Sequence, residues 1–271
     1  MKKIRKPSVC GYFYPGSRDK LIEDLKKYIV SDEEKKTSPK GIICPHAGYI
    51  YSGKTAGKVY GRIEPAETAI IIGPNHHGYG EPYAIDESDL WETPLGNIEI
   101  DDELRRKLLE KSRYLQPDST AHIPEHSIEV QIPFLQFLNP SVKIVPVLIS
   151  SMYDANPWYE IGYTIGLVIS GIKRNVIVVA SSDFTHYEPA EQAEKKDKKA
   201  IEKIVKLDED GFLKVVSEYE ISVCGFAPIT VVITASKILG AKEGLLVDYT
   251  NSGDVSGDFE QVVGYAGIIL L

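Results

Sequence analysis

Apolar runs and amphipathic segments alternate along nearly the whole chain. Most of the apolar runs are continuous in Val, Ile and Leu, which is typical of strands covered on both faces. They predict strands at residues 41–44, 68–73, 142–149, 175–180, 245–249 and 262–271. Apolar positions at helical spacing between these runs predict helices at residues 17–30, 53–61, 101–112, 126–138, 155–171, 190–206, 211–219 and 228–239.

This alternation predicts an α/β protein of three layers, with helices on both faces of a mostly parallel or mixed central sheet. A charged stretch at residues 32–40 is typical of a solvated linker, but no linker divides the chain into two parts. We therefore expect one α/β/α domain that spans residues 1–271.

The composition narrows the classes of partner and the location. The 271 residues carry a formal net charge of −8, which argues against a nucleic acid held by bulk electrostatics. Cys10, Cys44 and Cys224 are an odd number at wide spacing and predict no disulfide framework. No stretch is apolar over the length of a bilayer, and no apolar core follows the basic N-terminus as in a signal peptide. We expect a cytoplasmic protein that does not bind membranes.

Two predicted strands are followed at once by Pro, Gly and His. His46 comes after the strand at residues 41–44, and His76 and His77 come after the strand at residues 68–73. The carboxyl ends of strands in an α/β sheet meet over a crevice, where such proteins carry their chemistry. The pattern therefore predicts that histidine ligands reach this edge, and histidines in surface loops are the alternative. Because adjacent residues point in different directions, only one of His76 and His77 is expected to face the site.

A third strand end carries Asp183 and His186, which are three residues apart. A carboxylate beside an imidazole can orient the ring or adjust its acid–base behaviour, so we predict that Asp183 holds His186. The alternative is a capping Asp and a surface His. Cys224 precedes a predicted helix, whose N-terminus favours the thiolate that binds metals or attacks electrophiles. The alternative for Cys224 is a small buried apolar residue.

Three short motifs suggest other chemistry. Residues 48–55 fit the phosphate-loop pattern, with Lys54 and Thr55 as its nucleotide-binding residues, although Tyr and Ile fill variable positions that usually hold smaller residues. Residues 122–126 fit an inverted zinc-protease pattern, but Pro124 places the helix start after His122, so both histidines cannot share one helical face. Cys224 paired with His186 or His46 would make a nucleophile and its base.

The assembled strings resemble the Memo family over nearly the whole chain. The resemblance is carried by many motifs in one order: Gly11-Tyr12-Phe13-Tyr14-Pro15, Pro45-His46-Ala47-Gly48-Tyr49, Tyr51-Ser52-Gly53, Gly73-Pro74-Asn75-His76-His77, Thr93-Pro94-Leu95-Gly96, Glu125-His126-Ser127-Ile128-Glu129, Ser181-Ser182-Asp183-Phe184-Thr185-His186, Cys224-Gly225 and Val263-Gly264-Tyr265-Ala266. Because Tyr51-Ser52-Gly53 is one of these strings, the resemblance makes the phosphate-loop match coincidental.

The resemblance implies a fold similar to that of class III extradiol dioxygenases and one metal ion held by His46, His76 and Cys224. It places Asp183 and His186 beside the metal as catalytic residues. In those dioxygenases two histidines and a carboxylate hold Fe(II). Here a cysteine stands where the carboxylate would be. The fold analogy favours Fe(II), whereas the softer thiolate also suits copper and zinc and argues against ring cleavage by the dioxygenase route.

These implications give two functional hypotheses. The first is a redox or other metal-dependent enzyme that acts on an unknown small molecule. The second is a non-catalytic module that binds a protein or peptide. Under either hypothesis the resemblance implies the AmmeMemoRadiSam system, where this chain would be protein B and its partners a radical-SAM protein and an Ammecr-type protein.

Overall fold

The computed structural model describes residues 2–30, 36–152 and 155–271, and a twelve-stranded sheet forms the middle of the molecule. Four parallel strands lie at its centre in the order β8, β3, β9 and β2, and they span Lys143–Ile149, Thr68–Pro74, Val176–Ser181 and Gly41–Cys44. Because these strands run in one direction, the loops that follow them meet at one edge of the sheet. All four were predicted from their apolar runs, within a residue or two at each end.

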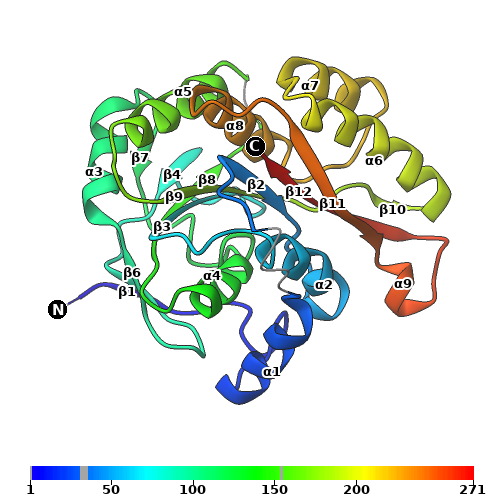
Figure 1. Cartoon of the computed structure of the whole chain (residues 1–271), viewed down its shortest axis with the longest axis horizontal. Helices are drawn as coiled ribbons and strands as arrows, with labels where there is room; N and C mark the ends of the chain where they lie inside the picture. Colours follow the sequence, from blue (N-terminus) through cyan, green and yellow to red (C-terminus); the bar gives the residue numbers. More distant parts are fainter. Residues whose placement is uncertain (1, 31–35, 153–154) are drawn as a thin grey trace.

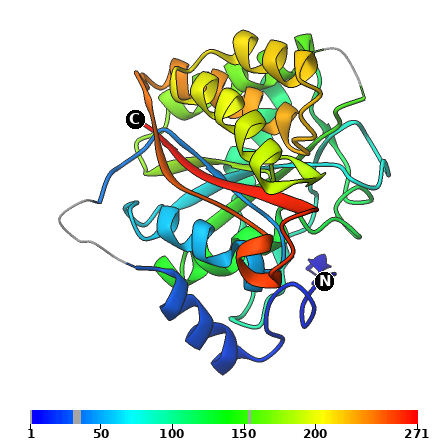
Figure 2. The same cartoon turned by 90° about the vertical axis from the view of Figure 1, so that its right-hand side faces the viewer.

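The remaining strands extend this centre on both sides. Their bounds are β1 Ile4–Arg5, β4 Tyr83–Ile85, β5 Leu90–Trp91, β6 Ile98–Ile100, β7 Gln116–Pro117, β10 His186–Glu188, β11 Gly244–Asn251 and β12 Val262–Leu270. The full order is β1-β5-β6-β8-β3-β9-β2-β12-β10, with β11 paired to β12 and β4 paired to β7 and β8. The long antiparallel hairpin β11–β12 crosses the molecule beside β2 (Figure 2).

Helices cover both faces of the sheet (Figure 1). One face carries α1 Arg18–Tyr28, α2 Tyr49–Tyr60 and α4 Ile132–Leu138, and the other carries α3 Asp102–Lys111, α5 Asn156–Ser170, α6 Ala190–Val205, α7 Glu209–Glu218 and α8 Phe226–Ile238. The short helix α9, Gly253–Ser256, lies in the connection between β11 and β12. The molecule is therefore an α/β structure of three layers, as the alternation along the sequence predicted.

Strand β3 shows why the apolar runs are continuous. Ile70 and Ile72 pack in the core on one side of the sheet, whereas Ala69 and Ile71 pack in the core on the other side. All seven residues of β3 are buried. Burying an Ile side chain contributes about 1.5–3 kcal/mol to the stability of the fold, so both faces of this strand stabilise the centre of the sheet.

Three predictions about local structure need correction or comment. The phosphate-loop alternative is wrong, because residues 49–55 form the first turns of α2 and Thr55 is buried, with its hydroxyl bonded to Asp248. The predicted helix at residues 126–138 is reduced to the 3₁₀ turn Glu129–Gln131 and α4. Of the predicted linker at residues 32–40, residues 32–35 lie outside the described residues, and Thr37 forms a bridge with Ile63.

Candidate metal centre

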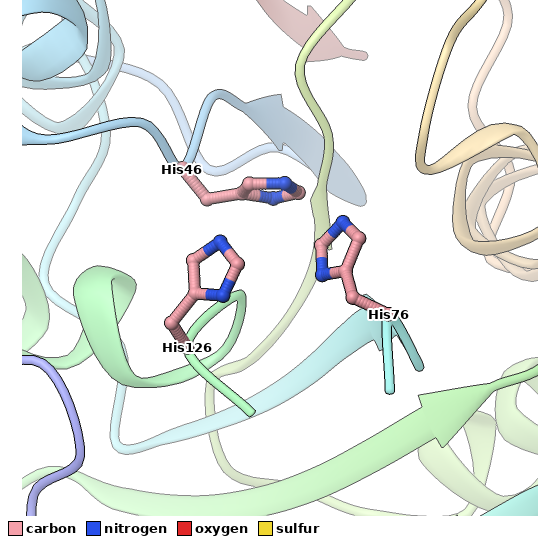
Figure 3. Close-up of side chains that lie close together, drawn as sticks. All are labelled: His46, His76 and His126. Carbon is pink, nitrogen blue, oxygen red and sulfur yellow. The ribbon is translucent and has the colours of Figure 1, made fainter. Parts of the chain in front are cut away.

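Three histidines from distant parts of the chain meet at the carboxyl edge of the sheet. His46 follows β2, His76 follows β3, and His126 lies in the turn before the 3₁₀ helix Glu129–Gln131. One ring nitrogen from each lies within 4.8 Å of the others. The rings turn toward a common space, as Figure 3 shows, and their centroids are 4.9–5.4 Å apart. This spacing suits a single metal ion between the three imidazoles.

The hydrogen bonds of His46 fix which ring nitrogen carries the proton. Ser181 Oγ donates to the carbonyl of Ser127 at 2.6 Å and accepts from Gln131 Nε2 at 2.8 Å. With its proton used, Ser181 Oγ can only accept from His46 Nδ1, which lies 3.0 Å away. We therefore assign the proton of His46 to Nδ1. This leaves the lone pair on Nε2, where a metal ligand needs it.

Glu125 holds the outer ring nitrogen of His76, as Ser181 does for His46. Its Oε1 lies 2.9 Å from His76 Nδ1, and its Oε2 accepts the backbone N–H of His76 at 2.8 Å. The same carboxylate accepts the backbone N–H groups of His126 and Ser127, each at 2.9 Å. A carboxylate that holds the outer nitrogen of a histidine orients the ring and strengthens the inner nitrogen as a ligand. His76 thus presents Nε2 to the space between the rings.

Cys224 lies next to His46. Its Sγ is 3.2 Å from His46 Nε2, and it accepts the backbone N–H of Asp183 at 3.2 Å. Burial, and then the charge of Asp183, raise the pKa of the Cys224 thiol. The expected effect of the α8 N-terminus is therefore outweighed by desolvation. The thiol is protonated in this state and can donate to His46 Nε2, so Cys224 has to lose that proton to become a ligand.

Two histidines of the cluster, His46 and His126, are held in the neutral form that ligation requires. Burial, followed by the neighbouring His126 and His76, lowers the pKa of His46 well below its usual range. Burial also lowers the pKa of His126 to about 4, against the opposing effect of the Glu125 charge. Burial alone would raise the pKa of Glu125, but the hydrogen bond and charge of His76 lower it overall, so this carboxylate stays ionised.

Asp183 and His186 are near the cluster, but their hydrogen bonds differ from those predicted. Asp183 Oδ1 accepts the backbone N–H of His46 at 2.8 Å, so this carboxylate holds the backbone that carries His46. The ring of His186 is held instead by Ser222, whose carbonyl lies 2.8 Å from His186 Nδ1. Since a carbonyl only accepts, Nδ1 carries the proton and Nε2 is free to act as a base. The orienting partner of His186 is therefore Ser222.

The structure places both His76 and Cys224 beside His46, whereas the three residues whose ligand atoms all lie within 4.8 Å of one another are His46, His76 and His126. It separates His76 from His77. The ring of His77 stacks on exposed Tyr79 with centroids 6.1 Å apart and does not belong to the group of three histidines. Sequence reasoning did not choose His126 as a ligand, because it favoured a capped, solvated helix start for this histidine over a place at a site with Glu125 and Glu129. Its place in the string Glu125-His126-Ser127, which the resemblance already included, was the available signal. His122 is fully buried beside Trp91, outside the cluster.

Comparison with known proteins agrees with this picture. The sequence profile of the family described as Memo-like protein matches residues 5–269. A MEMO1 family protein of Aquifex aeolicus is 44% identical over 273 residues, which cover 99% of this chain and 100% of that protein. A MEMO1 family protein of Methanosarcina barkeri is 43% identical over 268 residues, covering 98% and 100%. The solved structure of an uncharacterized protein of Escherichia coli K12 superposes with a TM-score of 0.57 at 11% identity, over 84% of this chain and 98% of that chain, which shows a shared fold.

Proposed function

Since this chain belongs to the Memo-like protein family, we propose that it binds one divalent or redox-active metal ion and acts as a metal-dependent enzyme on a small substrate. The observation that supports the proposal most directly is the convergence of His46, His76 and His126. In two of these rings the outer nitrogen is hydrogen-bonded, which leaves Nε2 free for a metal. The thiol of Cys224 adds a soft donor at the same place.

The donor set fits a first-row transition metal. Imidazole suits iron, copper and zinc, and thiolate favours copper(I), zinc and iron over the hard ions magnesium and calcium. We propose His46, His76 and Cys224 as ligands, as the family resemblance implies, with His126 as a further nitrogen donor from the geometry. Fe(II) is our first candidate, and copper and zinc are the others. Such an ion supplies Lewis-acid or redox chemistry to a substrate bound beside it.

The residues around the ligands would handle protons and hold the backbone. His186, with its proton fixed on Nδ1 by Ser222, can accept a proton from a substrate through Nε2. Asp183 keeps the segment after β2 in place through the backbone of His46. The side chain of His76 is 29% exposed, so a small molecule can reach the cluster from solvent.

The test of this proposal is the metal content of variants. Protein purified without an affinity tag is reconstituted anaerobically with Fe(II), Cu(I) or Zn(II) in turn, and metal is counted by elemental analysis. We expect one ion per wild-type chain, none in His46→Ala, and an unchanged count in His77→Ala, which alters a neighbouring histidine that stacks on Tyr79 and is not in the group of three. Comparing Cys224→Ala with His126→Ala shows which of the two is the stronger ligand. A wild-type chain that takes up none of these ions would refute the proposal.

A further inference from the structure

A buried ion pair contacts the chain segment that leads to His126 of the histidine cluster. Arg5 in β1 pairs with Glu129, and their side chains are 4% and 1% exposed. Arg5 also donates to the carbonyls of His122 at 3.0 Å and Glu125 at 2.6 Å, and its guanidinium lies 4.2 Å from the ring centroid of Trp91. The guanidinium therefore holds the turn at residues 122–125 by hydrogen bonds, and His126 follows this turn directly.

The Glu129 carboxylate binds the N-terminal loop at residues 8–14. It accepts the backbone N–H of Ser8 at 2.7 Å, that of Val9 at 3.1 Å, and the hydroxyl of Tyr14 at 2.7 Å. With Arg5, four donors saturate one buried carboxylate. This is the number of bonds that its two oxygens can accept.

The N-terminal loop in turn touches both histidine-bearing segments. The ring of Phe13 packs edge-on against His126 with centroids 4.9 Å apart, while His76 stacks on His126 with centroids also 4.9 Å apart. The carbonyl of Phe13 accepts the backbone N–H of Tyr49 at 2.7 Å, three residues after His46. His126 is therefore held between Phe13 and His76, and the loop links the segments that carry His46 and His126.

We propose that the Arg5–Glu129 pair and the N-terminal loop position the metal ligands, with Glu129 and Phe13 as positioning residues for His126 and Glu125. This inference rests on the proposed metal site. A buried ion pair adds little to the stability of the fold, because the cost of desolvating two charges offsets their attraction. An apolar pair in the same place often gives equal stability. A saturated pair that reaches both the N-terminal loop and the turn before His126 is better explained by the need to fix one arrangement of the cluster.

The test uses Co(II) as a spectroscopic probe, in wild type, Glu129→Gln and Phe13→Ala. Glutamine keeps the shape of Glu129 but removes its charge, whereas Phe13→Ala leaves the ion pair intact. If one of these variants folds poorly, the other still tests the proposal. The matched control is Asp101→Asn, because Asp101 is also buried and bonded to an arginine and a hydroxyl, but lies at the opposite edge of the sheet beside Thr68.

We expect both variants to bind Co(II) about 10–100-fold more weakly than wild type and to change the visible d–d bands, which report the ligand geometry. The control should keep the wild-type affinity within about twofold even if it melts at a lower temperature. Wild-type affinity and spectra in both folded variants would overturn the inference.

A second readout separates this inference from the proposed function. Hydrogen exchange followed by mass spectrometry needs no metal, and we expect faster exchange in residues 8–14 and 120–129 of Glu129→Gln but not of Asp101→Asn. If wild type binds neither Co(II) nor any of Fe(II), Cu(I) and Zn(II), the proposed function fails, and exchange alone decides whether the pair fixes these segments. Unchanged exchange in that case rejects the positioning role as well.

Discussion

The hydroxyl of Ser181 decides the protonation of His46, because it is the acceptor for His46 Nδ1. In Ser181→Ala the ring loses this acceptor, and Gln131 loses one of its two. We expect metal affinity to fall about 10–100-fold, since partners of ligating histidines contribute that much. The unfolding free energy should fall by about 1–3 kcal/mol because a buried donor is left unpaired. Competition titration against a chelator and urea unfolding measure the two effects.

Ser236 in α8 provides a matched control for this prediction. It is also a fully buried serine, but its hydroxyl has no hydrogen-bond partner among the described residues. We expect Ser236→Ala to leave metal affinity unchanged and stability equal or slightly higher, because an unsatisfied polar group is removed. Equal losses of metal affinity in the two variants would show that Ser181 has no specific role in orienting His46 for metal binding.

The single residues of the site show what sequence reasoning can and cannot reach. His46 and His76 could be predicted because each follows an apolar strand, and Cys224 because its string resembles that of a family. The role of His126 depends on the turn at residues 122–128, where four backbone and side-chain donors converge on Glu125. No periodic pattern encodes such a turn. The same holds for Ser222, whose carbonyl orients His186 from 36 residues away.

At the scale of elements, Asp197 in α6 joins β11 to the segment before β10. Its carboxylate accepts from Tyr249 at 2.7 Å and from the backbone and hydroxyl of Thr185 at 3.1 and 2.6 Å. Burial raises the pKa of Asp197 from 3.8 to about 6, although these hydrogen bonds lower it in part. The folded protein therefore binds a proton more tightly than the unfolded chain does. Its contribution to stability is complete below pH 4 and is lost as the pH rises through 6.

We therefore expect the unfolding free energy of wild type, relative to Asp197→Asn, to fall by about 3 kcal/mol between pH 3.5 and 7, since each pKa unit corresponds to 1.36 kcal/mol. Urea unfolding of both proteins across this pH range measures the difference between their unfolding free energies. The contributions of the other titrating groups cancel in this difference. Tyr249→Phe removes a hydrogen bond that lowers the pKa, so its loss of stability should occur at a higher pH. A difference that does not change with pH would contradict the assignment.

The elements also show why length decides what a sequence can predict. Strands β3, β8, β9 and β12 have six to nine residues and are buried on both faces, so their apolar runs stand out from the neighbouring polar segments. Strands such as β1, β5 and β7 have two residues each, and they exist only because a neighbouring strand supplies hydrogen bonds. No pattern of two residues can predict them. Strands β1 and β5 carry Arg5 and Trp91, which contact each other next to the turn at residues 122–125.

At the scale of the whole molecule, the cluster joins segments that are far apart in the sequence. His46 and Cys224 are separated by 178 positions. They reach the same space because β2 and β9 lie side by side, and because Cys224 is hydrogen-bonded to Asp183, which follows β9. None of the helices in residues 2–30, 36–152 and 155–271 combines the length and apolar character needed to cross a membrane. The cytoplasmic location remains a prediction from the composition of the sequence, and the radical-SAM and Ammecr-type partners remain predictions from the family resemblance.

This arrangement predicts that metal binding stabilises the entire fold. An ion held by His46, His76 and their neighbours binds only the folded chain with high affinity, because unfolding separates its ligands. At a free metal concentration 100 times the Kd, the unfolding free energy should rise by about 2.7 kcal/mol. For a chain of this size that corresponds to an increase in Tm of about 5–10 °C. Differential scanning calorimetry with and without metal measures this increase in Tm, and a chelator should reverse it.

The same increase is expected in Asp101→Asn, which lies away from the site, and none in His46→Ala. An equal increase in His46→Ala would place the bound ion elsewhere in the molecule.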